Sequence, residues 1–219
     1  MDKSFYFESL YPFQDDVLRL VSEIDTGLYL TGGTAASRAY LHHRFSDDLD
    51  FFTNDNAEFE LWAARLIQVL QDRKEWSTTV VQRDRRFVRL SLIRNDVPLK
   101  IEMVNDVPAH VGEIRRHEIL GRIDSPENIL ANKVTAVVDR EAAKDFADIW
   151  GFCYRLGLPL SVAIEGAQSK AAGIFPADLA RLLCSVKRQD WELVQWIEAP
   201  DPDGFISDLA RLGEGLILV

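Results

Sequence analysis

The spacing of apolar residues predicts a mixed α/β first half followed by a helical second half. In residues 9–25 and 57–73, apolar side chains recur every three or four positions, which is the period of an amphipathic helix. Shorter apolar or alternating segments, typical of strands, occupy residues 28–30, 48–52, 76–82, 86–93 and 97–104. Residues 34–42 read as helical, and Asn95-Asp96 is a typical turn between the last two strands.

The pattern changes near residues 106–124. Ser125-Pro126 is a favourable helix start, with serine as the N-cap and proline in the first helical position. From there to the end the apolar spacing is mostly helical. We therefore predict an α+β protein: an α/β domain over residues 1–124, with a mixed sheet and flanking helices, and a helical domain over residues 125–219.

Composition narrows the class of protein. The chain has 219 residues and a net charge of −10, which argues against a surface devoted entirely to nucleic acid. No apolar run approaches the about 18 residues of a membrane span, so no membrane partner is expected. Cys153 and Cys184 are far apart and lack zinc-type spacing, which fits free thiols and a cytoplasmic location.

Two short motifs in the first half can carry chemistry. Gly32-Gly33 ends a predicted strand and precedes a helix, so a ligand's phosphates could approach the backbone there. Asp48 and Asp50 are two residues apart on a predicted strand and therefore share one face. Paired carboxylates of this kind suit Mg²⁺. The alternatives are a tight strand-to-helix turn and a solvated strand edge.

A third carboxylate is available on a later strand. In residues 99–104 the apolar side chains alternate with Lys100 and Glu102, which share the opposite face. If this strand neighbours the one that carries Asp48 and Asp50, Glu102 completes the carboxylate set of a two-metal transfer site. The alternative is an ordinary solvated face of lysine and glutamate.

The helical half offers a lysine and two carboxylates. Lys133 lies beside a buried stripe, and Asp145 and Asp148 are three residues apart on one helix face. A lysine can bind phosphate as a point charge, and a nearby carboxylate can orient it. The alternative is a network of ion pairs that packs two helices together.

Basic residues concentrate in one predicted hairpin. Five arginines fall within twelve residues beside a single acid, Asp84: Arg83, Arg85, Arg86, Arg89 and Arg94. The rest of the chain holds 20 basic and 34 acidic residues. An RNA backbone could lie on such a patch, and the alternative is a charged edge that discourages aggregation between sheets. Arg115-Arg116-His117 is a smaller basic cluster that we expect to be a loop.

Together these segments resemble the nucleotidyltransferase AbiEii toxin family of the polymerase-β-like superfamily. The resemblance rests on five stretches in the expected order: 30–35, 43–52, 100–102, 133–140 and 144–148. It implies that Asp48 and Asp50 bind Mg²⁺ or Mn²⁺ and that Glu102 is the third carboxylate. It also implies a phosphate contact by Lys133 and a catalytic role for Asp145. The remaining nucleotide-binding residues that it implies are Gly32, Gly33, Thr34, Arg44 and Ser46.

The function implied by the resemblance is transfer of a nucleotide from an NTP to an acceptor hydroxyl. Some relatives modify tRNA ends, so RNA is a candidate acceptor, and an antitoxin protein is a candidate partner in a toxin–antitoxin pair. Two alternatives remain open. One is a catalytically silent NTP-binding protein of the same fold that acts through a protein partner. The other is a sugar-nucleotide transferase, against which Gly32-Gly33, Glu102 and Lys133 argue.

Overall fold

The structure is a computed structural model that describes residues 3–171 and 174–217. Two units can be distinguished along the chain. The sheet unit comprises residues 1–35, 46–108 and 113–124, and the helical unit comprises residues 36–45, 109–112 and 125–219. The predicted domains follow the chain continuously, whereas these units do not, because residues 36–45 and 109–112 group with the helical part.

The sheet unit contains a mixed sheet of seven strands, in the order β3-β4-β5-β2-β1-β7-β6. Strand β2 runs parallel to β5 and antiparallel to β1, and β1 runs parallel to β7. The predicted α+β class is confirmed. The strands are β1 (Tyr29–Thr31), β2 (Leu49–Asn54), β3 (Ser77–Asp84), β4 (Phe87–Arg94), β5 (Val97–Asp106), β6 (Arg115–His117) and β7 (Gly121–Ile123).

Strands β2 and β5 alternate between buried and partly exposed positions. Leu49 and Phe51 of β2 are buried, as are Leu99, Ile101 and Met103 of β5. The acidic residues between them are left on the other face, as the side-chain period of two requires. Asn95 and Asp96 adopt positive φ angles of 50° and 63° at the turn between β4 and β5, which suits a tight hairpin.

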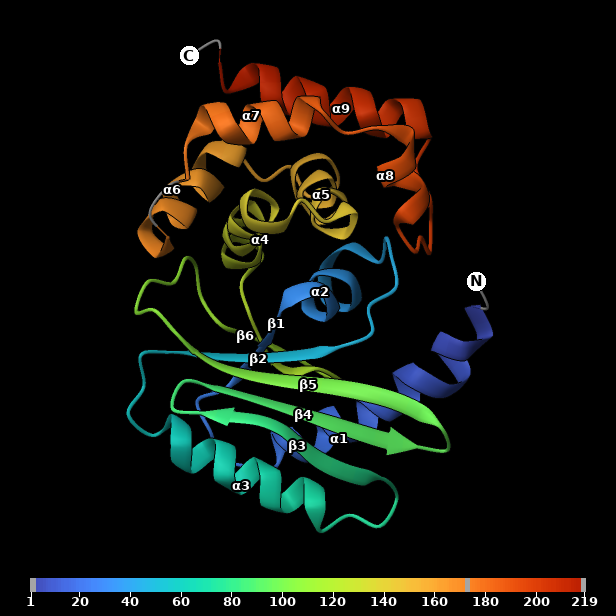
Figure 1. The fold of residues 1–219 in the computed structure, drawn as a ribbon, viewed down its shortest axis with the longest axis vertical. Coiled ribbons are helices and arrows are strands. Elements are labelled where there is room, and N and C mark those ends of the chain that lie inside the picture. Colours follow the sequence, from blue (N-terminus) through green and yellow to red (C-terminus); the bar gives the residue numbers. More distant parts are fainter. Residues whose placement is uncertain (1–2, 172–173, 218–219) are drawn as a thin grey trace. The chain divides into compact units, whose positions relative to one another are not determined.

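Helices α1 (Tyr11–Ser22) and α3 (Phe59–Gln71) lie on one side of the sheet (Figure 1). A short helical segment, η1 (Phe5–Leu10), precedes α1, so helical structure begins before the predicted start at residue 9. Helix α2 (Gly32–Ala35) follows β1 directly, and helical conformation continues through η2 (Ala36–Leu41). The predicted helix over residues 34–42 is therefore confirmed.

Helices dominate the second unit. Ser125 caps α4 as predicted: its Oγ accepts a hydrogen bond from the backbone N–H of Asn128 at 3.0 Å, and Pro126 occupies the first turn. The remaining helical elements are α4 (Pro126–Arg140), α5 (Ala143–Trp150), η3 (Gly151–Arg155), α6 (Leu160–Lys170), α7 (Pro176–Cys184), α8 (Arg188–Leu193) and α9 (Pro202–Gly215). In the described part of the chain, no helix is long and apolar enough to cross a membrane.

One prediction for the segment before α4 is wrong. Residues 115–117 were expected to form a loop, but they form β6, which pairs antiparallel with β7 at one edge of the sheet. Each of these strands has three residues. That is too short for an alternation of apolar and polar residues to be recognised in the sequence.

Candidate active site

The turn after β1 explains why glycine is needed at position 32. Gly32 has a φ of +67°, in the left-handed region that favours glycine. A Cβ atom built on Gly32 would lie 2.4 Å from Oδ2 of Asp50, which is closer than such atoms can approach. The Asp50 carboxylate therefore rests directly against this turn, and the predicted glycine and aspartate motifs meet in space.

The three predicted carboxylates lie on neighbouring strands. Asp50 of β2 and Glu102 of β5 are register partners in the parallel pair, and Asp48 immediately precedes β2. The side chains of Asp48 and Glu102 are 32% and 18% exposed. The predicted strand adjacency is thus confirmed, while the catalytic roles of these residues stay predictions.

Lys100 is a member of this cluster that the predicted site did not include. Its Nζ lies 2.9 Å from Oδ2 of Asp48 and 3.3 Å from Oε1 of Glu102. Burial disfavours the charged lysine, but Asp48, followed by Glu102 and Asp50, outweighs this and raises the pKa of Lys100 above its usual value. The available signal was its position two residues before Glu102, on the same strand face.

Glu102 is further constrained by Arg89 of β4, whose Nε donates a hydrogen bond of 2.7 Å to Oε1 of Glu102. The same oxygen therefore faces two cations, Arg89 and Lys100. We name Asp48, Asp50, Glu102, Lys100 and Arg89 the carboxylate cluster. Within it, Asp48 and Glu102 approach a single ammonium group, so their oxygens converge on one positive charge.

This donor set can be compared with the needs of a divalent cation. Mg²⁺ commonly binds one or two carboxylates and takes its remaining ligands from water and phosphate oxygens. Asp48 and Asp50 fit that requirement. Among the described residues, no group of three His, Cys, Asp or Glu side chains is arranged to hold a metal ion. Glu102 differs from the other two predicted ligands in that Arg89 and Lys100 both lie within ion-pair distance of its Oε1.

Thr34 and Ser46, two of the predicted nucleotide-binding residues, are buried beside Asp48. The Oγ1 atom of Thr34 lies 3.0 Å from Oγ of Ser46 and donates a hydrogen bond to the backbone carbonyl of Asp48. These contacts hold the segment that carries Asp48 against the turn after β1. Direct contacts of Thr34 and Ser46 with a nucleotide stay predictions.

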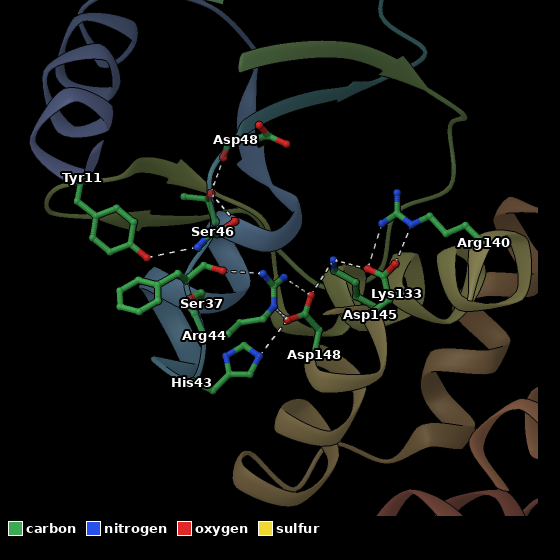
Figure 2. Close-up of polar contacts among 12 residues, drawn as sticks. Tyr11, Ser37, His43, Arg44, Ser46, Asp48, Lys133, Arg140, Asp145 and Asp148 are labelled. Carbon is green, nitrogen blue, oxygen red and sulfur yellow. Dashed lines mark hydrogen bonds and ion pairs between the residues drawn. The ribbon is translucent and has the colours of Figure 1, made fainter. Parts of the chain in front are cut away.

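The helical unit contains a second charged cluster, which centres on Asp148 of α5 (Figure 2). Nε and Nη2 of Arg44 each lie 2.7 Å from a different oxygen of this carboxylate. Nζ of Lys133 lies 2.7 Å from Oδ2, and Nε2 of His43 lies 3.0 Å from Oδ1. Asp145 accepts from Lys133 at 2.8 Å and from Arg140 at 2.8 Å.

We name Asp145, Asp148, Lys133, Arg44, His43 and Arg140 the buried ion network. Both aspartate side chains are fully buried. Burial alone would raise the pKa of Asp148, but Arg44 and Lys133 hold it well below its usual range. Burial would also raise the pKa of Asp145, but Lys133 and Arg140 outweigh it and lower this pKa below its usual value.

His43 is neutral in this network because burial lowers its pKa, although Asp148 opposes that shift. An ionised carboxylate can only accept, so Nε2 of His43 carries the proton and donates to Asp148. Nδ1 of His43 is then an acceptor. Among the described residues it is the buried side-chain polar atom that lacks a hydrogen-bond partner.

The buried ion network includes Arg44, one of the predicted nucleotide-binding residues. Its side chain is 4% exposed, Nε and Nη2 are bound to Asp148, and Nη1 donates to the carbonyl of Phe45 at 2.9 Å. Arg44 thus lies in the core of the helical unit, and its nucleotide contact stays a prediction. The predicted site does not include Asp148, whose partners Arg44 and His43 are more than 100 residues away in the sequence.

The five-arginine patch is smaller than predicted. Arg86 binds Asp55 at 2.9 Å, Arg89 binds Glu102, and Arg94 binds Asp16 at 2.5 Å while covering the ring of Phe13. Three of the five arginines are therefore held by the protein itself. Arg83, Arg85 and Arg86 are exposed, and of these Arg86 is paired with Asp55.

Comparisons with known proteins bear on this geometry. The profile of the family described as the nucleotidyl transferase AbiEii toxin of type IV toxin–antitoxin systems matches residues 17–155. The chain belongs to this family. The resemblance inferred from the motifs is confirmed, and the matched region includes both charged clusters. No curated protein sequence matches the chain.

Solved structures share the fold at low sequence identity. JHP933 from Helicobacter pylori is 20% identical with a TM-score of 0.64, and the match covers 95% of this chain and 92% of that protein. MenT4, a nucleotidyltransferase toxin from Mycobacterium tuberculosis H37Rv, is 15% identical with a TM-score of 0.70, over 96% and 83% of the two chains. As a member of the family, the chain is a nucleotidyltransferase of the toxin class.

Proposed function

We propose that this nucleotidyltransferase is metal-dependent and transfers a nucleotide from an NTP to an acceptor hydroxyl. The observation that carries the proposal is the contact of Asp50 with the Gly32 turn, with Asp48 two residues before it and Glu102 beside it on the parallel strand. Paired carboxylates beside a glycine turn suit a cation–triphosphate complex. Asp48 and Asp50 would hold Mg²⁺ or Mn²⁺.

The chemical step that we propose is an in-line displacement. The acceptor oxygen forms a bond to the α-phosphorus of the NTP, the bond to pyrophosphate breaks, and the hydroxyl proton passes to water or to a carboxylate. A bound cation supplies neutralisation of phosphate charge. The residues of the protein contribute by positioning the carboxylates. Gly32 leaves room for the side chain of Asp50, and Arg89 and Lys100 bind the carboxylate of Glu102.

We further propose that the acceptor is an RNA end, with tRNA as the first candidate, and that the protein is the toxin of a toxin–antitoxin pair. The family supports the toxin role. The RNA acceptor is supported by Arg83 and Arg85 of the predicted patch, which are exposed and have no role in the carboxylate cluster or in the ion pairs described above.

The decisive experiment incubates the protein with each α-labelled NTP, Mg²⁺ and total RNA, and follows label into RNA, protein and small molecules. Asp48→Ala and Asp50→Ala variants are expected to abolish transfer. An Asp72→Ala variant, which removes an exposed carboxylate at the end of α3, serves as the matched control and should transfer as the wild type does.

The outcomes separate the remaining alternatives. Label in RNA would support the acceptor that we propose. Label in protein alone would reject RNA as the acceptor but would still show that the protein transfers nucleotides. NTP binding without transfer to any acceptor would instead favour a silent nucleotide-binding protein. Growth arrest on expression, reversed by a gene next to this one, would support the toxin role.

A further inference from the structure

The segment that leads into β2 carries Asp48 but has no regular structure of its own. Residues 46–48 lie outside the helices and strands, between the end of the helical unit's residues 36–45 and the start of β2 at Leu49. Backbone polar groups in such a segment need partners from elsewhere when they are shielded from water. Those partners decide where Asp48 is held.

The N-terminal helices supply most of these partners. The side chain of Gln14 in α1 is fully buried, and its Nε2 donates to the carbonyls of Ser46 at 3.2 Å and Asp47 at 3.0 Å. The hydroxyl of Tyr11 accepts a longer bond, 3.4 Å, from the N–H of Ser46 (Figure 2). A single buried amide thus bridges two successive carbonyls immediately before Asp48.

Tyr6 of η1 adds a side-chain anchor. It is 3% exposed, and its hydroxyl donates a hydrogen bond of 2.6 Å to Oδ1 of Asp47. Asp47 is not a member of the carboxylate cluster, and this bond fixes the residue that immediately precedes Asp48. From the side of α2, Thr34 holds the carbonyl of Asp48.

We propose that Gln14 and Tyr6 are positioning residues for Asp48, so that η1 and the start of α1 form part of the active site. The inference rests on the proposed function for the role of Asp48. Both residues precede residue 17, where the match to the family profile begins. Because misplacing a reacting group by about 1 Å can reduce a rate about 100-fold, bonds of this kind can control activity without touching substrate.

The test compares Tyr6→Phe with a matched control, Tyr29→Phe. Each variant removes one hydroxyl from a buried tyrosine of the sheet unit: that of Tyr6 binds Asp47, and that of Tyr29 binds Asn54 at 2.7 Å. The ring of Tyr6 keeps its edge contact with Tyr11 after the change. Gln14→Met, which removes the amide and keeps the length, is the stronger variant.

Amide hydrogen exchange across residues 46–50 is the first readout. We expect exchange about five-fold faster in Tyr6→Phe, as the loss of one hydrogen bond predicts, and faster still in Gln14→Met. Tyr29→Phe should leave these amides unchanged. The second readout is binding of Mn²⁺ with a non-hydrolysable NTP, expected to weaken several-fold in the first two variants. In transfer assays kcat should fall more than KM rises.

Two results would overturn the inference. Exchange at residues 46–50 that is the same in Tyr6→Phe, Gln14→Met and the wild type would show that these bonds do not hold the segment. Faster exchange with unchanged Mn²⁺–nucleotide affinity would show that they serve folding alone. A wild-type protein that transfers nothing would instead reject the proposed function, and the exchange and binding measurements would still decide the role of Gln14 and Tyr6.

Discussion

The carboxylate cluster of the sheet unit and the buried ion network of the helical unit use the same residue types, but their charges are balanced differently. Asp145 and Asp148 are fully buried and are matched by two arginines, a lysine and a neutral histidine. Asp48 and Glu102 keep some exposure and share one lysine. The buried carboxylates are already paired with cations of the protein and would be costly to leave unpaired, whereas a partly exposed cluster of carboxylates is suited to an incoming cation.

The largest difference between the clusters should appear in activity. Asp48→Asn is expected to reduce nucleotide transfer by about a thousandfold, the scale for removing one electrostatic element of an active site. The free energy of unfolding should change by no more than about 0.5 kcal/mol, because the side chain is partly exposed and contacts mainly Lys100. Transfer assays and urea denaturation of the same preparation check both parts. A fall of several kcal/mol in the free energy of unfolding would show that Asp48 stabilises the fold as the buried aspartates do.

The converse change is Asp148→Asn in the buried ion network. It leaves the buried charge of Arg44 without its carboxylate and removes one of the two carboxylates that bind Lys133, so the free energy of unfolding should fall by about 3–5 kcal/mol. Asp55→Asn, which breaks the exposed pair with Arg86, is the control and should lower it by at most about 1 kcal/mol. Equal effects in urea denaturation would mean that burial does not set the strength of these pairs.

Much of the sheet unit could be predicted from the sequence because its signals are local. The alternation around Asp50 and Glu102 places both carboxylates on one face, and the Asn95-Asp96 turn marks the hairpin beside them. Ser125 and Pro126 mark the start of α4 in the same way. Each of these signals is complete within a few residues, so it does not depend on knowing the three-dimensional fold.

The features that could not be predicted from the sequence depend on contacts between residues that are far apart in the chain. Asp148 is bound by Arg44, which is 104 positions away, and no local pattern identifies such a partner. Arg89 and Arg94 belong to the predicted basic patch, but they are bound by Glu102 and Asp16, which the local sequence does not identify as partners. Strand β6 is held by its place at the sheet edge and not by an apolar period of its own.

The pH dependence of stability offers a finer test of the buried ion network. His43 has a lowered pKa in the folded protein, so below pH 6.5 the unfolded chain takes up a proton that the folded protein does not. The free energy of unfolding should therefore fall as the pH drops below 6.5. The contribution of Asp148, whose pKa is lowered, is present above pH 3.8 and is lost only as the pH falls through lower values.

Two histidine variants isolate this effect. His43→Gln keeps a donor for Asp148 but cannot titrate, so the fall between pH 6.5 and 5 should be reduced. His42→Gln changes the adjacent exposed histidine and should keep the wild-type slope. Urea denaturation at a series of pH values gives both slopes. Parallel curves for the wild type and His43→Gln would contradict the neutral, buried state of His43.

The smallest expected effect concerns the cation that the carboxylate cluster already contains. In Lys100→Met the ammonium no longer competes for Asp48, so Mn²⁺ should bind about five-fold more tightly, the scale of one charge pair at contact in a water-like medium. Stability should barely change, because the pair is partly exposed. Arg89→Met removes a charge that contacts Glu102 but not Asp48, and should tighten Mn²⁺ binding less.

The two variants together show why the affinity changes. If both bind Mn²⁺ more tightly by the same factor, the overall charge of the sheet face sets the metal affinity. If only Lys100→Met binds it more tightly, the lysine ammonium occupies the place where the cation binds. Titration calorimetry with Mn²⁺ distinguishes the two, and the second result would make the open cluster a site balanced by a replaceable charge, unlike the fixed pairs around Asp148.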